Sequence, residues 1–476
     1  MSSRLRVLVV EDDRDQAQAV EDACNRAIDQ PDTLVEVVVD ASSAIDLLSS
    51  QDFDLVVCDL AIPHTLHSFV PDRDEGLRVV QAVRRTQPGL PIIVLSEHGK
   101  DPTILRRIIE EGGRADPYGM GVARQMIIPF PKEEFLACEE AIADSLGRSA
   151  GLASIPVTGP GAGALMVGEE RAVQILARGA GGAAARVIRL DEGLSGAKVL
   201  RVSLTAEDGG HRGKIVAKIG EHERALRERE AWEAAAFQLP PSLGAPLAKS
   251  IEAGAGRFAA VIYRDLEEHG RDLFEILAVD PLQAGAVVET LRERFRSIHE
   301  GAAEKTFTLM GLRRRIVNRS DLALAGDLAD RIRALDEISI PGHECLQHGD
   351  LHGKNVLVNN EGAPILIDYA DFGHTSRVLD PVTAELSTVF HPSAADARRD
   401  WPTIRRMSEY FDLEGYLDGC PFPDFVRSCR AWQQAAGGKH EIAAVVLAYA
   451  LRQLRYDDTD QDLAKVLIKV ALAQLE

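Results

Sequence analysis

Short apolar runs alternate with amphipathic stretches over the first part of the chain. The runs at residues 7–10, 35–39, 55–58 and 91–95 predict strands. Strands that read as nearly continuous apolar runs are typical of a parallel sheet with helices on both faces. The pattern therefore predicts a doubly wound α/β domain over residues 1–145. The stretches between the runs predict helices at residues 15–28, 42–48, 76–86 and 103–111.

The pattern changes at a stretch that is rich in glycine and proline. Residues 147–163 lack any apolar period, which indicates a flexible boundary. Residues 166–178 then show helical spacing again. We therefore interpret residues 146–184 as a flexible linker with a lead-in helix.

Strands and then helices follow this linker. The strands and one charged helix predict a small lobe over residues 185–268, and later helices with apolar three-to-four spacing predict a helical lobe over residues 269–476. The predicted strands are residues 185–190, 198–204, 213–219 and 258–263, and the predicted helices are residues 221–236, 281–301, 404–410, 425–434, 441–456 and 463–475.

Composition narrows the class of protein. The 476 residues are too many for one core, and 45% hydrophobic with 27% charged residues fits globular domains. The net charge of -20 argues against binding to nucleic acid or an anionic membrane. Six scattered cysteines without a Cys-x-x-Cys pair argue against zinc and disulfides. No run is long enough for a signal peptide or a membrane span, so we expect a cytoplasmic protein.

Three carboxylates and a serine follow strands of the first domain. Glu11 and Asp12 follow the first strand, Asp59 follows the third and Ser96 follows the fourth. The carboxyl ends of parallel strands meet at one edge of the sheet, where function gathers in doubly wound folds. Clustered carboxylates repel one another unless a divalent cation joins them, and that cation would also neutralise an incoming phosphoryl group.

This domain resembles the response-regulator receiver domain, which has a flavodoxin-like fold. The resemblance implies that Asp59 is the phosphorylated aspartate, that Glu11, Asp12 and Asp59 bind Mg²⁺, and that Ser96 is the switch hydroxyl. It also implies a histidine kinase as the upstream partner. The matching motifs are residues 9–12 (Val-Val-Glu-Asp), 58–63 (Cys-Asp-Leu-Ala-Ile-Pro) and 93–96 (Ile-Val-Leu-Ser).

The domain departs from the receiver pattern in two places. Residues 64–75 form an insertion beside Asp59, because the family reaches its glycine sooner than Gly76. The family also places a lysine before a proline to pair with the acyl phosphate. Alignment on Pro-Phe puts Ile128 in that position, and the nearby substitute, Lys132, comes four residues late. We therefore expect a receiver that binds Mg²⁺, with weakened phosphorylation or readout.

The second half of the chain is organised around residues 346–373. His348-Gly-Asp350 opens a loop, Asn355 follows, and Asp368 closes the apolar run at residues 365–367. Phosphoryl transfer needs one carboxylate to accept the proton of the acceptor hydroxyl. It also needs an amide and a second carboxylate to hold the Mg²⁺ that bridges the nucleotide phosphates.

These motifs resemble the aminoglycoside and choline phosphotransferase branch of the protein-kinase-like fold, over residues 185–475. The resemblance implies a two-lobed α+β fold with catalytic loop 348–355, Asp350 as catalytic base, and Asn355 and Asp368 as Mg²⁺ ligands, with His348 orienting the loop. The literal Asp371-Phe-Gly is not the expected metal motif. The family ligand lies about thirteen residues past the asparagine, which selects Asp368 and leaves Asp371 as a secondary polar residue.

The small lobe offers residues for nucleotide binding. The glycine turn at residues 193–196 can bring backbone N–H groups close to phosphates. A lysine in the third strand matches the strand lysine that contacts phosphates in kinases. One glutamate of the next helix should pair with this lysine, and spacing does not separate the two candidates. The predicted ATP-binding residues are Gly193, Ser195, Gly196, Lys218, Glu228 and Glu230.

Two acidic residues downstream allow two interpretations. Asp380 and Glu385 match the structural acid of the family, and they equally fit a helix N-cap and a surface charge.

The sequence thus predicts a two-component-type signalling protein whose receiver regulates an ATP- and Mg²⁺-dependent phosphotransferase. Its acceptor would carry a hydroxyl, on a small molecule or a protein. The fusion most resembles the bacterial ternary-complex-associated kinase-like proteins. Two alternatives stay open: a non-catalytic nucleotide-binding scaffold under receiver control, and an active phosphotransferase whose receiver only forms a homodimer.

Overall fold

The computed structural model describes residues 5–27, 33–68, 70–97, 106, 113–192, 197–240, 243–264, 271–317 and 319–476. The chain divides into two compact units. The first comprises Met1–Arg227 and Leu247–Asp265, and the second comprises Glu228–Pro246 and Leu266–Glu476. The predicted receiver therefore shares a unit with most of the small lobe, and the helical lobe forms most of the other.

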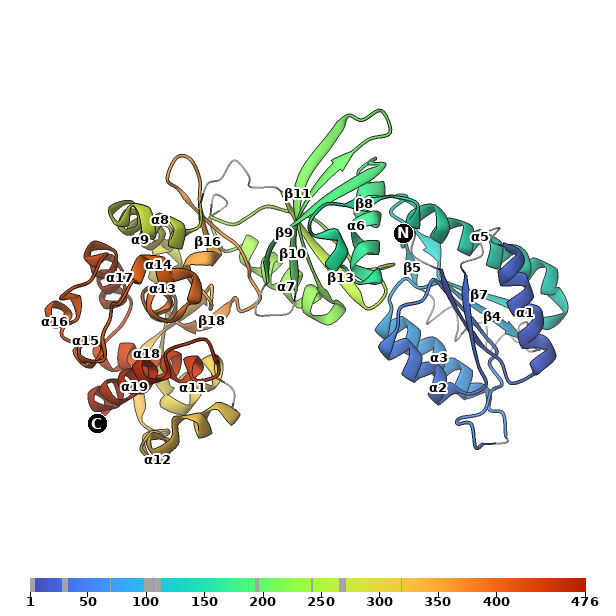
Figure 1. Ribbon diagram of the computed structural model, residues 1–476. Helices are drawn as coiled ribbons and strands as arrows, with labels where there is room; N and C mark the ends of the chain where they lie inside the picture. The colour runs from blue at the N-terminus through green and yellow to red at the C-terminus, as the bar shows by residue number, and fades with distance from the viewer. Residues whose placement is uncertain are drawn as a thin grey trace. The chain divides into compact units, whose positions relative to one another are not determined.

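The receiver is a five-stranded parallel sheet with helices on both faces, as predicted (Figure 1). Alternate residues of the strands enter two cores: Leu8 and Val10 pack with α2 and α3, while Val7 and Val9 pack with α1 and α5. The sheet order is β2 (Leu34–Val38), β1 (Arg6–Val10), β3 (Leu55–Cys58), β4 (Ile92–Ser96) and β7 (Ile127–Pro131). The helices are α1 (Arg14–Ala27), α2 (Ala41–Ser50), α3 (Arg73–Thr86) and α5 (Phe135–Ala153).

Besides the fifth strand, β7, and the helix α5, two further features of the receiver were not predicted. A two-residue hairpin, β5 (Arg114–Ala115) and β6 (Arg124–Gln125), precedes β7. The helix α3 begins three residues earlier than expected, because Asp72 caps it by accepting a hydrogen bond from the Asp74 N–H. The predicted helix at residues 103–111 lies outside the described residues, apart from residue 106.

Regular elements occupy most of the stretch that the sequence predicted as a flexible linker. The helix α5 continues to Ala153, so it contains the first glycines of the stretch. Gly159 has a left-handed φ of 102°, and a Cβ there would lie 2.5 Å from the Val187 carbonyl, so only glycine fits. The lead-in helix is confirmed as α6. The elements after α5 are β8 (Val157–Thr158), the short helix η2 (Ala162–Ala164) and α6 (Val167–Gly179).

The small lobe is a six-stranded sheet that includes β8. The strand β8 pairs in parallel with β9, and all other pairs are antiparallel. Val173 and Leu176 of α6 pack against Val187 and Val202 in a core that covers one face. The order is β12 (Leu247–Ile251), β13 (Phe258–Arg264), β11 (His211–Glu221), β10 (Lys198–Thr205), β9 (Ala184–Glu192) and β8, and α7 (His222–Ala236) follows β11. The strand β12 was not predicted.

The receiver and the small lobe are joined by polar contacts within the first unit. Arg257, after the β12–β13 turn, donates from its backbone N–H to Asp52 Oδ1 at 3.0 Å and from Nε to the same oxygen at 3.2 Å. Arg171 of α6 donates to Asp54 Oδ1 at 2.7 Å. Both aspartates precede β3, so these contacts lie at the opposite edge of the receiver sheet from Asp59.

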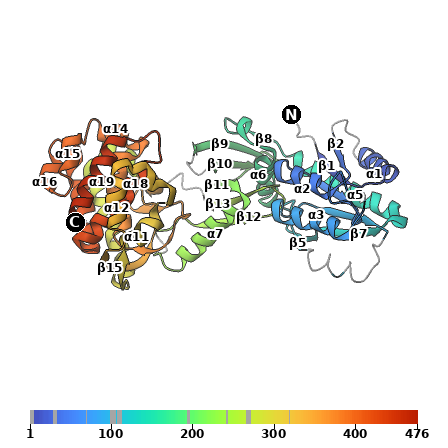
Figure 2. The same cartoon turned by 90° about the horizontal axis from the view of Figure 1, so that it is seen from below.

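The helical lobe is built around one fully buried helix and one largely buried helix. All twelve residues of α13 (Leu379–Phe390) are buried, and α18 (Lys439–Gln453) is apolar on nearly every side. Two small sheets carry the loops: β14 (Ala303–Thr308), β15 (Ser339–Gln347) and β18 (Gly373–Ser376), and β16 (Val356–Val358) with β17 (Pro364–Leu366). Figure 2 shows α18 and α19 (Gln461–Leu475) adjacent, as their shared core requires.

The helices predicted at residues 404–410, 425–434 and 463–475 are present, one predicted helix differs, and the other helices of this lobe were not predicted. The helix predicted at residues 281–301 is interrupted at Phe295, which separates α9 from α10. The bounds are α8 (Leu273–Val279), α9 (Pro281–Arg294), α10 (Arg296–Glu300), α11 (Leu309–Ile316), η3 (Arg319–Leu328), α12 (Ala329–Ala334), η4 (Gly353–Asn355), α14 (Ala395–Arg398), α15 (Ile404–Ser408), α16 (Leu413–Leu417) and α17 (Pro423–Ala436).

Candidate functional site

The structure brings the predicted receiver carboxylates together. One carboxylate oxygen from each of Glu11, Asp12 and Asp59 lies within 4.8 Å of the others. Glu11 and Asp59 follow the neighbouring strands β1 and β3, and both are buried. Ser96 is the last residue of β4, which pairs with β3, so it lies at the same edge of the sheet.

Lys132, and not Ile128, faces these carboxylates. Its Nζ lies 2.8 Å from Asp59 Oδ2 and 3.0 Å from Glu11 Oε2. The register explains why: Ile128 pairs with Ile93 in the middle of the sheet, whereas Pro131 pairs with Ser96 at its carboxyl edge. The lysine that follows β7 therefore reaches the site, although it comes four residues late in the sequence alignment.

The charges of this cluster are strongly coupled. Burial and the neighbouring Asp59 raise the pKa of Glu11 to about 7, although Lys132 acts in the opposite direction. Burial alone would lower the pKa of Lys132, but hydrogen bonds and ion pairs with Asp59 and Glu11 raise it. Oxygen ligands from several carboxylates suit Mg²⁺, so this donor set fits the ion. Bound there, the ion would reduce the repulsion among the carboxylates.

The catalytic loop of the helical lobe is anchored by a buried acid. Asp380 is fully buried in α13 and accepts hydrogen bonds from the backbone N–H groups of His348 at 2.7 Å and Gly349 at 2.9 Å. His348 Nε2 lies 3.0 Å from the carbonyl oxygen of Ile367. Asp380 is therefore the structural acid, and its interpretation as an N-cap is wrong. Glu385 is not a surface charge either, since it is buried and lies 2.7 Å from Arg430 Nε.

Asp350, Asn355 and Asp368 are tied to one another through the backbone. Asn355 Nδ2 donates to the carbonyl oxygen of Asp350 at 2.8 Å, and the Ile367 N–H donates to the carbonyl oxygen of Asn355 at 3.0 Å. Asp368 comes next and has a left-handed φ of 63°. Such backbone strain in a residue other than glycine clusters at functional sites. This donor set of one amide and one carboxylate suits Mg²⁺.

Asp371 differs from Asp368 in its surroundings. Burial, followed by the charge of Asp350, raises the pKa of Asp371. Its carbonyl oxygen packs against Gly349, where a Cβ would approach to 2.2 Å. The backbone of Asp371 thus packs under the catalytic loop, which agrees with a secondary role.

Arg452 is a member of this site that the sequence did not reveal. Its Nη2 lies 3.1 Å from Asp350 Oδ1, and His352 Nε2 lies 3.6 Å from Asp350 Oδ2. Burial alone would raise the pKa of Asp350, but Arg452 and the neighbouring histidines hold it below its usual range. Arg452 ends a long apolar helix that is distant from residues 348–355 in sequence, so no local motif indicated it.

The predicted nucleotide-binding residues are only partly described. Lys218 is half-buried in β11. Glu228 is 4% exposed, whereas the side chain of Glu230 is 64% exposed, which favours Glu228 as the inward-facing acid. Gly193, Ser195 and Gly196 lie outside the described residues.

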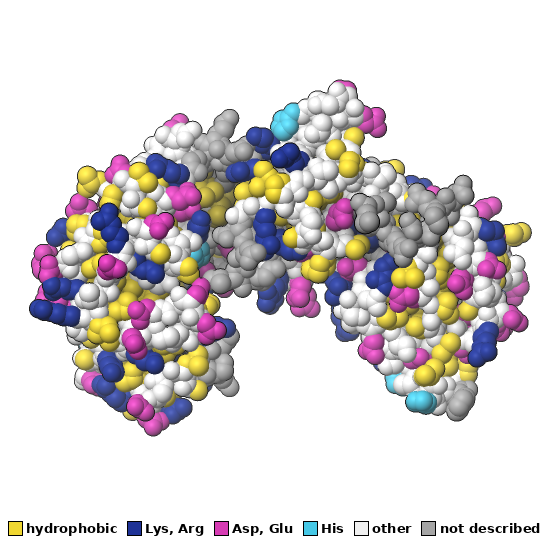
Figure 3. Space-filling view, viewed as in Figure 1, with side chains coloured by type: hydrophobic (Ala, Val, Ile, Leu, Met, Phe, Trp, Pro, Cys, Tyr) yellow, Lys and Arg dark blue, Asp and Glu magenta, His cyan; other side chains and the backbone are white. Residues whose placement is uncertain are grey.

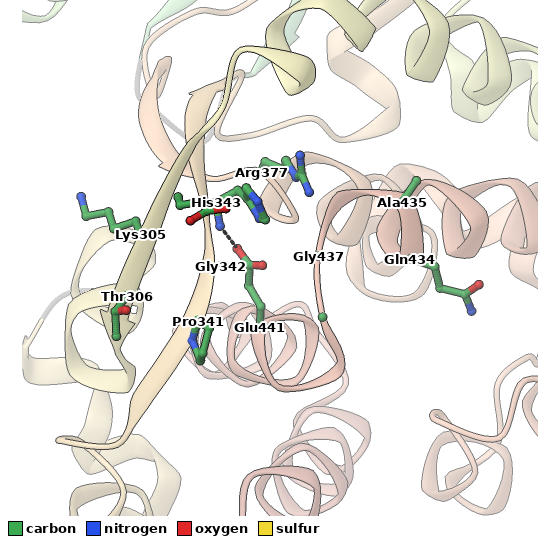
Figure 4. Close-up of a pocket in the computed structure, with 12 residues that line it drawn as sticks. Lys305, Thr306, Pro341, Gly342, His343, Arg377, Gln434, Ala435, Gly437 and Glu441 are labelled. Atoms are coloured by element: carbon green, nitrogen blue, oxygen red, sulfur yellow. Dashed lines mark hydrogen bonds between the residues drawn. The ribbon is translucent and has the colours of Figure 1, made fainter.

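A cavity of about 550 Å³ in the helical lobe is separate from the catalytic loop (Figure 4). It lies beside Gly342 and His343 of β15, where Glu441 Oε1 accepts hydrogen bonds from the His343 N–H at 3.3 Å and from Ser376 Oγ at 2.7 Å. Asp350 follows the carboxyl end of β15, roughly 20 Å from Gly342 along the extended strand. This cavity therefore does not hold the candidate site.

Comparisons with known proteins match both halves of the chain. Residues 7–114 match the response regulator receiver domain, and residues 176–410 match the phosphotransferase enzyme family. The response regulator MprA of Mycolicibacterium vanbaalenii is 31% identical over 154 residues, which cover 31% of this chain and 57% of that protein. The chain spans about half the length of the curated response regulators that it matches.

Solved structures of low identity also match the second half. A thermostable mutant of the aminoglycoside phosphotransferase APH(4)-Ia, in complex with ADP and hygromycin B, is 13% identical, with 60% of this chain and 93% of that chain covered and a TM-score of 0.34. Choline kinase LicA from Streptococcus pneumoniae is 14% identical, with 61% and 92% covered and a TM-score of 0.32. The family matches and the geometry agree: the chain is a response regulator receiver domain fused to a domain of the phosphotransferase enzyme family, with a kinase-like fold.

Proposed function

We propose that the protein transfers the γ-phosphoryl group of ATP to a hydroxyl acceptor under control of its receiver domain. The observation that carries this proposal is the anchored catalytic loop. Asp380 fixes the loop backbone, Asn355 binds the carbonyl of Asp350, and the strained Asp368 follows the strand next to Asn355. Backbone strain of this kind destabilises a fold, so its presence beside the anchored loop favours a catalytic role.

Each residue has a role in the proposed transfer. Asp350 orients the acceptor hydroxyl and accepts its proton as the oxygen attacks the γ-phosphorus. Asn355 and Asp368 would hold Mg²⁺, which neutralises charge on the nucleotide phosphates. Lys218 and the turn with Gly193, Ser195 and Gly196 would hold those phosphates, and buried Glu228 would orient Lys218.

The receiver supplies the regulatory input in this proposal. A histidine kinase phosphorylates Asp59, while Glu11 and Asp12 would hold Mg²⁺ with it. Lys132 pairs with the acyl phosphate, and Ser96 responds to it. Among the described residues, no helix is long and apolar enough to cross a membrane. The free cysteines, five of them buried, fit the reducing cytoplasm as the place of action.

ATP turnover tests the enzyme claim. We expect Asp350→Asn to lower ADP release by roughly 100-fold or more while ATP binding, followed by thermal shift, is retained. Asp458→Asn removes an exposed carboxylate of the same lobe and should leave both readouts unchanged. If wild type and Asp350→Asn are equally inert while both bind Mg-ATP, the chain is a nucleotide-binding scaffold.

A further inference from the structure

The catalytic carboxylate is covered by a cation in the free protein. Arg452 Nη2 contacts Asp350 Oδ1 at 3.1 Å, and the two side chains are 19% and 25% exposed, so the pair remains open to a small molecule. Arg452 Nε donates to the Tyr456 hydroxyl at 3.4 Å. Among the described residues, Nη1 of Arg452 has no hydrogen-bond partner, so the guanidinium retains free donor capacity.

Imidazole rings lie beside Arg452 along the loop, although burial lowers the pKa of His352. The rings of His352 and His391 lie 4.7 Å apart, and Phe274 packs 5.1 Å from His391. Arg398 Nη1 donates to the His391 carbonyl oxygen at 2.9 Å, which holds a second guanidinium near these rings. All these residues belong to the second compact unit.

Among the described residues, no ion pair joins Arg452 to the carboxylates that follow it in sequence, although the charge of Asp460 acts on Arg398. Asp460 caps α19 by accepting hydrogen bonds from the Asp462 and Leu463 N–H groups at 3.0 Å. Asp457 and Asp458 are exposed. The acid that forms an ion pair with Arg452 is Asp350, and the charge of Arg452 also acts on Asp371.

This arrangement bears on the charge of the acceptor. A hydroxyl that contacts Asp350 would lie close to Arg452, and an ammonium group on the same small molecule would be repelled by the guanidinium. A carboxylate or phosphate would instead form a bidentate pair with it.

We propose that Arg452 binds the acidic group of the acceptor, so that the phosphotransferase acts on hydroxyl compounds that also carry a carboxylate or phosphate. This inference rests on the proposed function. In the free protein Arg452 masks Asp350. The acceptor anion draws the guanidinium away, which frees Asp350 Oδ1 to take the hydroxyl proton. The acceptor oxygen then bonds to the γ-phosphorus as the bond to the β-phosphate oxygen breaks, and ADP leaves with the electron pair.

A matched series of two-carbon hydroxyl compounds tests this inference. Glycolate, ethylene glycol and ethanolamine differ in charge at similar size, and glycerol phosphate separates phosphate from carboxylate recognition. Binding to the full chain is measured by calorimetry in the presence of Mg-ADP, and transfer by ADP release with Mg-ATP. We expect an anionic probe to bind at least about tenfold more tightly than ethanolamine.

Variants connect that preference to Arg452. Arg452→Gln should weaken anion binding by about tenfold or more and raise KM for the anion with a smaller change for ethylene glycol, while Arg452→Lys should restore part of the affinity. Arg455→Gln, at an exposed arginine one turn further, is the matched control and should change neither.

Three groups of outcomes separate the anionic-acceptor inference from the proposed phosphotransferase function. Equal or tighter binding of ethanolamine, no binding of either anion, or anion binding that survives Arg452→Gln overturns the inference. Anion binding through Arg452 without ADP release from any acceptor supports the inference but contradicts the proposed phosphotransferase. ADP release that favours ethanolamine leaves the phosphotransferase standing and removes the anionic acceptor.

Discussion

Single residues in this protein depend on partners that are distant in sequence. Lys132 reaches Asp59 because β7 places Pro131, not Ile128, at the carboxyl edge of the sheet. Arg452 reaches Asp350 from the end of α18. Motif spacing identified the chemical groups, including Asp350 and Asp59. It named Lys132 only as a nearby substitute and did not identify Arg452, because strand register and helix packing, rather than local sequence, determine which cation contacts each carboxylate.

His299 should make the helical lobe sensitive to acid. Burial, with the nearby Arg377, lowers its pKa from 6.5 to about 4. Because the folded state holds the neutral ring, this contribution to stability is complete above pH 6.5 and is lost as pH falls towards 4. The loss is of the order of 3 kcal/mol in unfolding free energy. His299→Phe keeps an aromatic ring beside Trp432 and should remove this part of the pH dependence.

Tryptophan fluorescence during urea unfolding measures this effect in the correct lobe. All three tryptophans, Trp232, Trp401 and Trp432, belong to the second unit. The exposed His440→Gln serves as control and should follow the wild-type pH profile. A pH profile that is identical in wild type and His299→Phe would contradict the assignment.

At the level of elements, burial affects how clearly a helix appears in the sequence, although α18, buried on nearly every side, was predicted. Amphipathic helices such as α1 and α3 were predicted from their spacing, whereas α13, buried on every side, has no polar face to set a period. The helix α5 was not predicted, because its glycines resemble those of a domain boundary although they lie inside the helix. Glycine content alone therefore does not separate a linker from a closely packed helix.

Asp380→Asn should loosen the catalytic loop through α13. The amide would present a donor to one of the N–H groups of His348 and Gly349, leaving a buried polar group unsatisfied. We expect a loss of about 1–3 kcal/mol in unfolding free energy of the helical lobe, followed by tryptophan fluorescence in urea.

Asp330→Asn is the matched control for this change. Asp330 also lies in the first turn of a helix, α12, but its side chain is 92% exposed and pairs with Arg333. Its loss should cost less than about 1 kcal/mol. Similar losses for the two variants would mean that Asp380 acts through the helix dipole alone.

At the scale of the whole molecule, the surface charge pattern agrees with the net charge of the chain, and the division into compact units agrees with its length. Figure 3 shows acidic and basic side chains interspersed over the face in view, as the net charge of -20 without a basic motif suggests. The α/β class of the receiver followed from apolar periodicity, and the two-lobed fold followed from the resemblance of the motifs at residues 348–368. The association of the receiver with the small lobe could not be predicted from the sequence. It depends on loops whose side chains, such as Asp52 and Arg257, follow no hydrophobic period.

Gly254→Ala should separate the receiver from the small lobe. Gly254 has a φ of 89°, its N–H donates to the Pro88 carbonyl at 2.8 Å, and a Cβ would lie 2.2 Å from the Pro117 carbonyl. Gly181→Ala imposes a similar φ strain of about 1–2 kcal/mol, with open space around its Cβ. Hydrogen exchange should therefore rise in residues 52–54 only for Gly254→Ala. Equal exchange in the two variants would show that docking does not depend on this contact.

The pairing of β8 with β9, together with the docking of Asp52 and Asp54, has a consequence for how such proteins diversify. Receivers are commonly treated as interchangeable cassettes. Here a recombination event that replaced residues 1–145 would keep the edge strand β8 but would replace Asp52 and Asp54, which dock the receiver on the small lobe. An event that replaced residues 1–158 would also remove β8 from the sheet of the small lobe. A productive exchange must carry the receiver through α6 together with the β12–β13 turn, so the two halves are expected to be inherited together.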